Sequence, residues 1–116
     1  MQNKNDIALE KHGPVVILKI QGDITSFSEP FLNQAYKQAN DQGTAKILLN
    51  LEEGAYINSG GIAFLIQILA QTKKNNQQIS ITGLSEHFKK IFNMVGITKF
   101  ADIHKDVESA VAAMSK

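Results

Sequence analysis

The chain has 116 residues, the length of one domain, and 43% of them are apolar, which is enough to form a core. Because it contains no cysteine, disulfide bonds, thiolate metal sites and a cysteine nucleophile are excluded. The 12 basic residues are all lysine and the 11 acidic residues leave a net charge of +1, so no strongly charged partner is implied. The absence of arginine argues against base recognition, and we expect no nucleic-acid partner.

The first predicted elements are two strands and a helix. Residues 7–10 and the β-branched run 15–20 are predicted strands, and the turn signal His12-Gly13-Pro14 between them predicts a hairpin. Ser28-Glu29-Pro30 is typical of a helix start, with Ser28 as the capping residue. Gly43 is the predicted end of that helix.

The rest of the chain alternates between strands and helices. The spacing predicts a buried strand over 46–51, a loop over 52–59, a helix over 60–74, a strand over 78–82, a helix over 87–95, a strand over 100–103 and a helix from Asp106. The order β-β-α-β-α-β-α-β-α predicts an α/β fold with a mixed, mostly parallel sheet of about five strands and four helices. We expect one domain over residues 1–116.

Helical periodicity predicts which side chains face the core. The inward residues are expected to be Phe31, Leu32, Ala35, Tyr36 and Ala39; Ile62, Leu65, Ile66 and Leu69; Phe88, Ile91, Phe92 and Val95; and Val107, Ala110, Val111 and Met114. Phe64 falls on the other side of helix 60–74, where an exposed aromatic ring would mark a partner surface. The alternative is that a sheet or a neighbouring helix covers both sides of this helix.

No set of residues in the chain is typical of catalysis or of a bound cofactor. The three histidines, at positions 12, 87 and 104, have no partner at a metal-ligand spacing. No nucleophile elbow and no nucleotide fingerprint occurs. The polar N-terminus and the short apolar runs predict a cytoplasmic protein that does not insert into a membrane. We therefore predict a protein that is not an enzyme, without metal or cofactor.

One polar segment, Asn58-Ser59-Gly60-Gly61, precedes the apolar helix. The first N–H groups of a helix lack intrahelical partners and carry partial positive charge, which favours a bound anion or a phosphate on Ser59. Glycine lets a ligand approach the backbone closely. The simpler interpretation is that Asn58 or Ser59 only caps the helix.

Four segments, in the same order and covering nearly the whole chain, resemble the STAS domain (sulfate transporter and anti-sigma factor antagonist). They are VVILKIQGDIT, EPFL, KILLNLEEGAYINSGGIAFLIQIL and ISITGLSEHFKKIFNMVGITKF. The chain is most similar to the small, stand-alone bacterial antagonists of this family. The resemblance implies a protein that binds an anti-sigma factor, which is also a serine kinase, and so releases a sigma factor.

The resemblance further implies that Ser59 is the residue phosphorylated by that kinase and that a phosphatase removes the phosphate. The implied docking surface combines the loop after the second strand, the loop before Asn58 and the second helix. Its predicted partner-binding residues are Asp23, Ile24, Thr25, Phe27, Tyr56 and Phe64.

The chain departs from the family pattern near Ser59. Asn58 and Asn50 stand where the family has aspartate, Thr25 replaces a third aspartate, and Gly60 replaces the second hydroxyl residue. A kinase that recognises those carboxylates would bind this chain less well. The alternatives are an interaction subunit of a signalling or membrane transport complex that is not phosphorylated, and a nucleotide- or anion-binding module that uses Asn58 to Gly61.

Overall fold

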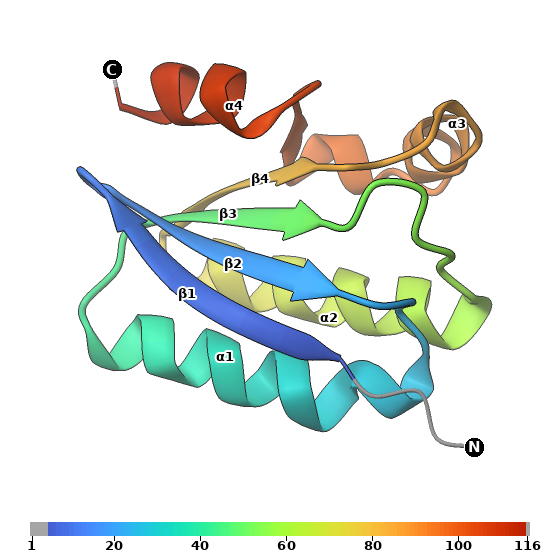
Figure 1. Ribbon diagram of the computed structural model, residues 1–116, viewed down its shortest axis with the longest axis horizontal. Helices are drawn as coiled ribbons and strands as arrows, with labels where there is room; N and C mark the ends of the chain where they lie inside the picture. The colour runs from blue at the N-terminus through green and yellow to red at the C-terminus, as the bar shows by residue number, and fades with distance from the viewer. Residues whose placement is uncertain (1–4, 116) are drawn as a thin grey trace.

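The computed structural model describes residues 5–115, which form a five-stranded sheet with helices on both faces (Figure 1). The strands are β1 (Asp6–His12), β2 (Val15–Gln21), β3 (Lys46–Leu51), β4 (Gln78–Thr82) and β5 (Asp102–Ile103). The helices are α1 (Glu29–Asp41), α2 (Ser59–Lys74), α3 (Glu86–Met94) and α4 (Val107–Met114), with two 3-10 helices, η1 (Ser26–Ser28) and η2 (Ile97–Lys99).

The strands lie side by side in chain order. β1 and β2 form an antiparallel hairpin in which His12 is paired with Val15, and β2, β3, β4 and β5 are parallel. Each parallel pair requires a crossover connection, which the helical segments provide. The predicted fold class, a mixed and mostly parallel sheet with four helices, is confirmed.

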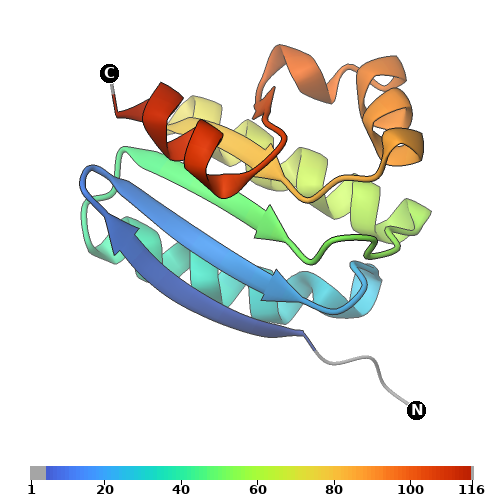
Figure 2. The same cartoon turned by 45° about the horizontal axis from the view of Figure 1, so that its top comes forward.

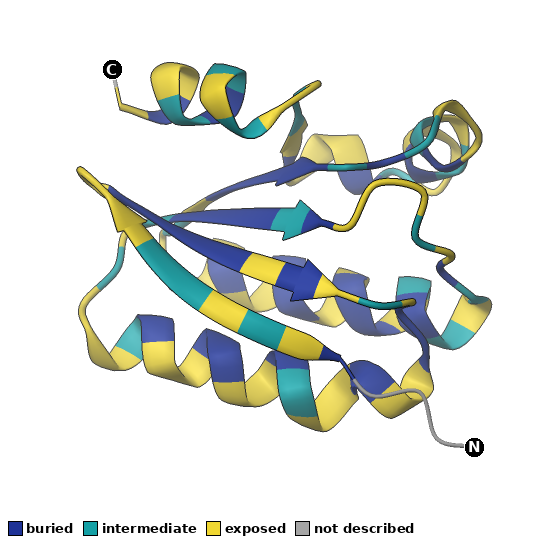
Figure 3. Ribbon diagram, viewed as in Figure 1, coloured by how far each residue is buried: buried dark blue, intermediate teal, exposed yellow. Residues whose placement is uncertain are grey.

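Two apolar clusters hold the layers together. α1 and α2 cover one face of the sheet and α4 lies on the other (Figures 1 and 2). Because side chains alternate along a strand, Val16 and Leu18 of β2 join the larger cluster with α1 and α2, whereas Val15 and Ile17 pack against α4. Figure 3 shows this as buried central strands between helices with exposed outer faces. Burial of strand 46–51 is confirmed for its apolar residues.

The end of α3 and the start of the last strand differ from the prediction. Ser85 caps α3, since its Oγ accepts a hydrogen bond from the N–H of Phe88 at 3.2 Å. The helix ends at Met94, so Val95 lies beyond it and is exposed, because Gly96 with φ +85° turns the chain away. Phe100 is also exposed and precedes β5, because it forms the C-cap of η2, where its N–H donates to the carbonyl of Ile97 at 2.9 Å.

The residue predicted to cap α1 has another role. Ser28 makes no side-chain capping bond to α1, because it belongs to η1. Its hydroxyl accepts from the N–H of Thr25 at 3.0 Å and donates to the carbonyl of Asp23 at 3.3 Å. Thr25 Oγ1 in turn accepts from the N–H of Phe27 at 3.1 Å, which completes a capping box around η1.

We expect α4 to lose stability in acid because its first turn depends on an ionised cap. Asp106 Oδ1 accepts a hydrogen bond from the N–H of Ser109 at 2.7 Å, and this bond holds the pKa of Asp106 below its ordinary value. The stabilisation is complete above the pKa that Asp106 has in the unfolded chain. It is lost as the pH falls through the lower pKa that Asp106 has in the folded chain. NMR carbon shifts of residues 107–114 should report this loss.

The matched control for this titration is Asp106→Asn, which keeps a capping oxygen without an ionisable proton. In this variant the shifts of residues 107–114 should change little over the same acid range. Equal loss of helical shifts in both proteins would show that the cap is not the cause.

Candidate functional site

The start of α2 is built around Asn58. The Oδ1 atom of Asn58 accepts a hydrogen bond from the N–H of Gly61 at 2.8 Å, so the side chain caps the helix. Asn58, one of the two residues expected to cap this helix, therefore does so. The cap also uses one of the first-turn N–H groups that an anion would need, and Ser59 begins the helix with its side chain exposed to solvent.

Gly61 has a packing role. A Cβ atom at this position would lie 2.2 Å from the carbonyl oxygen of Ile24, closer than any real contact. The absence of a side chain thus lets the loop after β2 press directly against the first turn of α2. Gly60 is less constrained, since its Cβ would lie 3.0 Å from Cβ of Ser26.

Backbone hydrogen bonds join the loop after β2 to the loop before α2. The N–H of Ile24 donates to the carbonyl of Tyr56 at 2.9 Å, and the N–H of Asn58 donates to the carbonyl of Ile24 at 3.1 Å. These bonds form a parallel bridge between Ile24 and Ile57. The Asp23 carboxylate also accepts from the N–H of Tyr56 at 3.0 Å. The two loops therefore present one continuous surface beside Ser59.

Four of the predicted site residues meet on this surface with their side chains exposed. Asp23 and Ser59 are exposed, and the two aromatic residues Phe27 and Tyr56 expose 62% and 58% of their surface. Such aromatic side chains in solvent are unusual for residues that serve only the core. We call Asp23, Phe27, Tyr56 and Ser59 the loop surface.

Three of the predicted partner-binding residues are buried and do not present their side chains on this surface. Ile24 is fully buried, because its backbone forms the bridge while its side chain enters the core. Thr25 is buried and its hydroxyl caps η1. Phe64 is only 4% exposed and packs in the larger cluster, so the prediction of an outward ring is wrong.

The error at Phe64 comes from the phase of α2. The buried residues of this helix are Gly61, Phe64, Leu65, Ile68, Leu69 and Thr72, a regular helical stripe. Ile66, predicted to face the core, is 39% exposed instead, and Ile62 is only partly buried. The signal that could have set the phase is Lys73: the predicted stripe continues to this charged residue, whereas the stripe that begins at Gly61 includes Ile68 and leaves Lys73 exposed.

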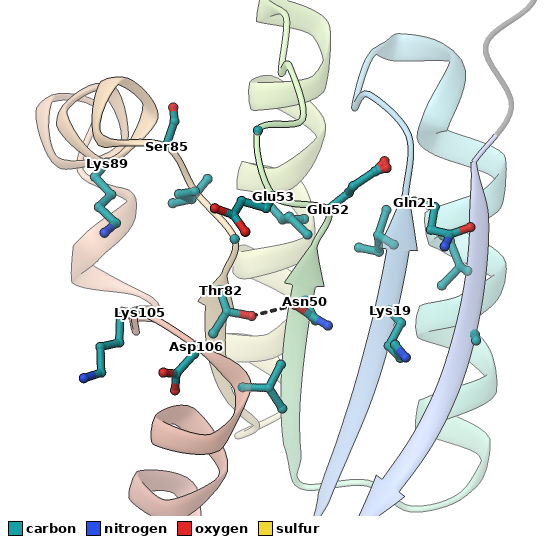
Figure 4. A pocket seen from close by; sticks show the side chains of 18 of the residues that line it. Lys19, Gln21, Asn50, Glu52, Glu53, Thr82, Ser85, Lys89, Lys105 and Asp106 are labelled. Carbon is teal, nitrogen blue, oxygen red and sulfur yellow. Dashed lines mark hydrogen bonds between the residues drawn. The ribbon is translucent and has the colours of Figure 1, made fainter.

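A second feature is an open groove of about 1020 Å³ on the α4 side of the sheet. It lies at the carboxyl ends of β2, β3 and β4, where parallel sheets commonly bind ligands (Figure 4). No pattern in the sequence predicts a site at this position. The residues Asn58 to Gly61 do not line it, so this groove is separate from the helix start that was predicted to bind anions.

Residues 5–115 contain neither a metal-binding cluster nor a membrane-spanning helix. No group of three or more His, Asp or Glu side chains in this part of the chain is arranged to hold a metal ion. Among the helices described, none is long and apolar enough to cross a membrane.

Comparison with known proteins shows the family. The STAS domain family matches residues 6–110, and the chain therefore belongs to this family. Among curated relatives, the anti-sigma-B factor antagonist of Staphylococcus aureus (strain NCTC 8325 / PS 47) is 23% identical over 91 residues, which are 78% of this chain and 84% of the relative. The antagonist of the same name from Staphylococcus epidermidis is 22% identical over 97 residues, covering 84% and 90%.

Solved structures show the same fold at low sequence identity. An anti-sigma factor antagonist from Mycobacterium paratuberculosis superposes with a TM-score of 0.77 at 16% identity, covering 97% of this chain and 96% of that one. The anti-sigma factor antagonist SpoIIAA superposes with a TM-score of 0.69 in its unphosphorylated form, covering 95% and 97%, and 0.67 in its phosphorylated form, covering 94% and 99%; both are 14% identical.

Proposed function

We propose that this protein is a cytoplasmic anti-sigma factor antagonist, a regulatory binding protein and not an enzyme, that docks an anti-sigma factor through the loop surface. The observation that carries the proposal is the exposed hydroxyl of Ser59 beside two exposed aromatic rings, Phe27 and Tyr56. Aromatic side chains of this kind commonly supply most of the binding energy of an interface. The names of the curated relatives support the same function.

We further propose that the anti-sigma factor is a kinase that phosphorylates Ser59 and that a phosphatase reverses the reaction. A phosphate adds a charge of roughly −2 in the middle of the docking surface. The start of α2 would tolerate it, because the helix dipole is positive there. A partner that places apolar or acidic groups on the loop surface would then be repelled. The solved phosphorylated form of SpoIIAA supports a switch of this kind.

The phosphorylation proposal can be tested with the kinase-type anti-sigma factor from the same genome and labelled ATP. We expect the chain to incorporate phosphate and Ser59→Ala to incorporate none. Ser26→Ala is the matched control, since Ser26 is an exposed hydroxyl residue close to Gly60 and should not alter labelling. Equal labelling of Ser59→Ala and the unaltered chain would remove Ser59 from the mechanism.

A second candidate function is a constitutive interaction subunit without a covalent switch. The observation that favours it is Asn58, a neutral side chain already engaged in capping, at the position where the family has an acid. This function predicts that Ser59→Asp binds the anti-sigma factor as tightly as the unaltered chain. The switch predicts a loss of about tenfold or more, because the added charge would be desolvated in the interface.

A further inference from the structure

The floor of the groove is a row of polar side chains aligned across the sheet. In the strand register, Lys19 of β2 lies beside Asn50 of β3, and Asn50 lies beside Thr82 of β4. In the preceding row on the same face, Ile17 and Leu48 are apolar and pack with α4, and Ser80 of β4 is a buried polar residue. This face is therefore mostly apolar beside α4 and polar on all three strands at the floor of the groove.

The central residue of the row has a fixed orientation. Thr82 is a buried residue with only 1% of its surface exposed, and its hydroxyl donates a hydrogen bond to Oδ1 of Asn50 at 3.0 Å. The amide nitrogen of Asn50 is thereby turned away from Thr82, towards the side of the groove where Lys19 lies (Figure 4). Within residues 5–115 that nitrogen has no hydrogen-bond partner. A partly buried amide held in place with unused donors is suited to bind an acceptor.

A second donor stands next to the Asn50 amide. Lys19 is exposed and pairs with Glu10 at 3.1 Å, which lies towards the hairpin and outside the groove. One ion pair leaves two of the three ammonium hydrogens available. Adjacent strands are about 4.8 Å apart, so the Lys19 and Asn50 donors can contact one carboxylate together.

The charged side chains that line the groove are more often acidic than basic: Asp6, Glu52, Glu53, Glu86 and Asp106 stand against Lys19, Lys89 and Lys105. Glu52 and Glu53 follow directly after β3, and in Figure 4 the Glu52 carboxylate lies on the side of Gln21 and the Glu53 carboxylate on the side of Ser85. Neither glutamate forms an ion pair within the described part of the chain. These carboxylates would repel a multiply charged anion such as a nucleotide and attract an ammonium group.

We propose that this groove binds a small zwitterion of the amino-acid type, with its carboxylate at Lys19 and Asn50 and its ammonium group at Glu52, whose carboxylate lies on the β2 side of the groove. Residues i and i+2 on one face of a strand are about 7 Å apart, as Asn50 and Glu52 are expected to be. Their flexible side chains can therefore contact the two ends of one molecule of that size. The site is independent of the loop surface and of any event at Ser59.

Replacing the polar residues of the groove floor should also have a measurable effect on the melting temperature. If the hydrogen bond between Asn50 and Thr82 serves only the fold, removing it should lower the melting temperature; if the two residues serve a ligand, binding is lost while stability is kept or raised. Asn50→Leu with Thr82→Val removes both partners of one hydrogen bond and leaves no unpaired group, which is nearly neutral or stabilising. We expect this double variant to melt at the same temperature as the unaltered chain or higher.

The binding test is a two-dimensional NMR titration of the full chain with a mixture of L-amino acids at millimolar concentration. We expect saturable shifts at residues 19–21, 50–53 and 82–85, and none at Phe27 or Tyr56. The Asn50→Leu/Thr82→Val variant should bind about tenfold or more weakly. Lys37→Ala, an exposed lysine on α1 paired with Asp41, is the matched control and should bind normally.

Separate titrations with acetate, methylamine and ATP decide the class of ligand. We expect none of them to reproduce the shifts at the same concentration. The proposal is overturned if no amino acid causes saturable shifts, if acetate, methylamine or ATP causes the same ones, or if the double variant binds as the unaltered chain does. Should the double variant not fold, Lys19→Met and Glu52→Gln replace it, since both side chains are exposed, and each should weaken binding.

Discussion

Replacement of Gly61 by alanine is expected to lower the free energy of unfolding by about 3 kcal/mol or more, with a fall in melting temperature of about 10 °C or more. The new Cβ would lie 2.2 Å from the carbonyl oxygen of Ile24. That oxygen accepts the hydrogen bond from Asn58, so any shift that relieves the clash also weakens the junction between the two loops. Differential scanning calorimetry measures the effect directly.

The sign of this effect separates packing from helix propensity. Alanine in place of glycine inside a helix usually stabilises by about 0.5–1 kcal/mol. Gly60→Ala is the matched control one residue earlier, where the Cβ would lie 3.0 Å from Cβ of Ser26, 3.3 Å from its backbone nitrogen and 3.4 Å from Oδ1 of Asn58, so a shift of a few tenths of an ångström relieves the contact. We expect Gly60→Ala to be close to neutral. A stabilised Gly61→Ala variant would refute the close approach of Ile24 to α2.

The sheet and the order of elements were predictable because local signals agreed with one another. The turn before Pro14, the caps at Asn58 and Ser85, and the left-handed glycine at position 96 all mark real boundaries. Caps and turns depend on interactions between residues three or four positions apart, so they can be predicted from a short stretch of sequence. The family resemblance also held, since its motifs follow the same elements.

The predictions failed for residues whose burial is decided by contacts with parts of the chain that are distant in sequence. Residues 62–66 of α2 are all apolar, so periodicity within that run fits more than one face and could not tell Phe64 from Ile66. Ile24 and Thr25 stand in a polar loop that reads as surface, yet a bridge to Ile57 and the cap of η1 bury them. The polar row of the groove depends on the register of three strands far apart in sequence, which no local pattern reveals.

These differences change how the docking surface should be tested. A charged substitution at Phe64 would place a carboxylate in the core and unfold the chain, so lost binding would carry no information about the interface. Exposed residues can be altered without this ambiguity. Among the predicted docking residues, Phe27 and Tyr56 meet that condition.

Replacing both Phe27 and Tyr56 by alanine is therefore expected to abolish measurable binding to the anti-sigma factor, and each single replacement should weaken it by about 30-fold, or about 2 kcal/mol. The rings stand on loops already fixed by hydrogen bonds to Ile24 and Asp23, so they reach a partner with little loss of entropy on binding. Calorimetric titration of the purified partner gives the affinities, and the melting temperature shows whether each variant is folded.

Two further variants make this prediction specific. Tyr56→Phe keeps the ring and its edge contact with Phe88, and should bind nearly as well as the unaltered chain. Met94→Ala removes the most exposed large apolar side chain described, 83% in solvent, from the far end of α3. If apolar exposure alone governed docking, Met94→Ala would weaken binding as much as Tyr56→Ala does. We expect it to have no effect, because the proposed docking surface surrounds Ser59 and does not include Met94.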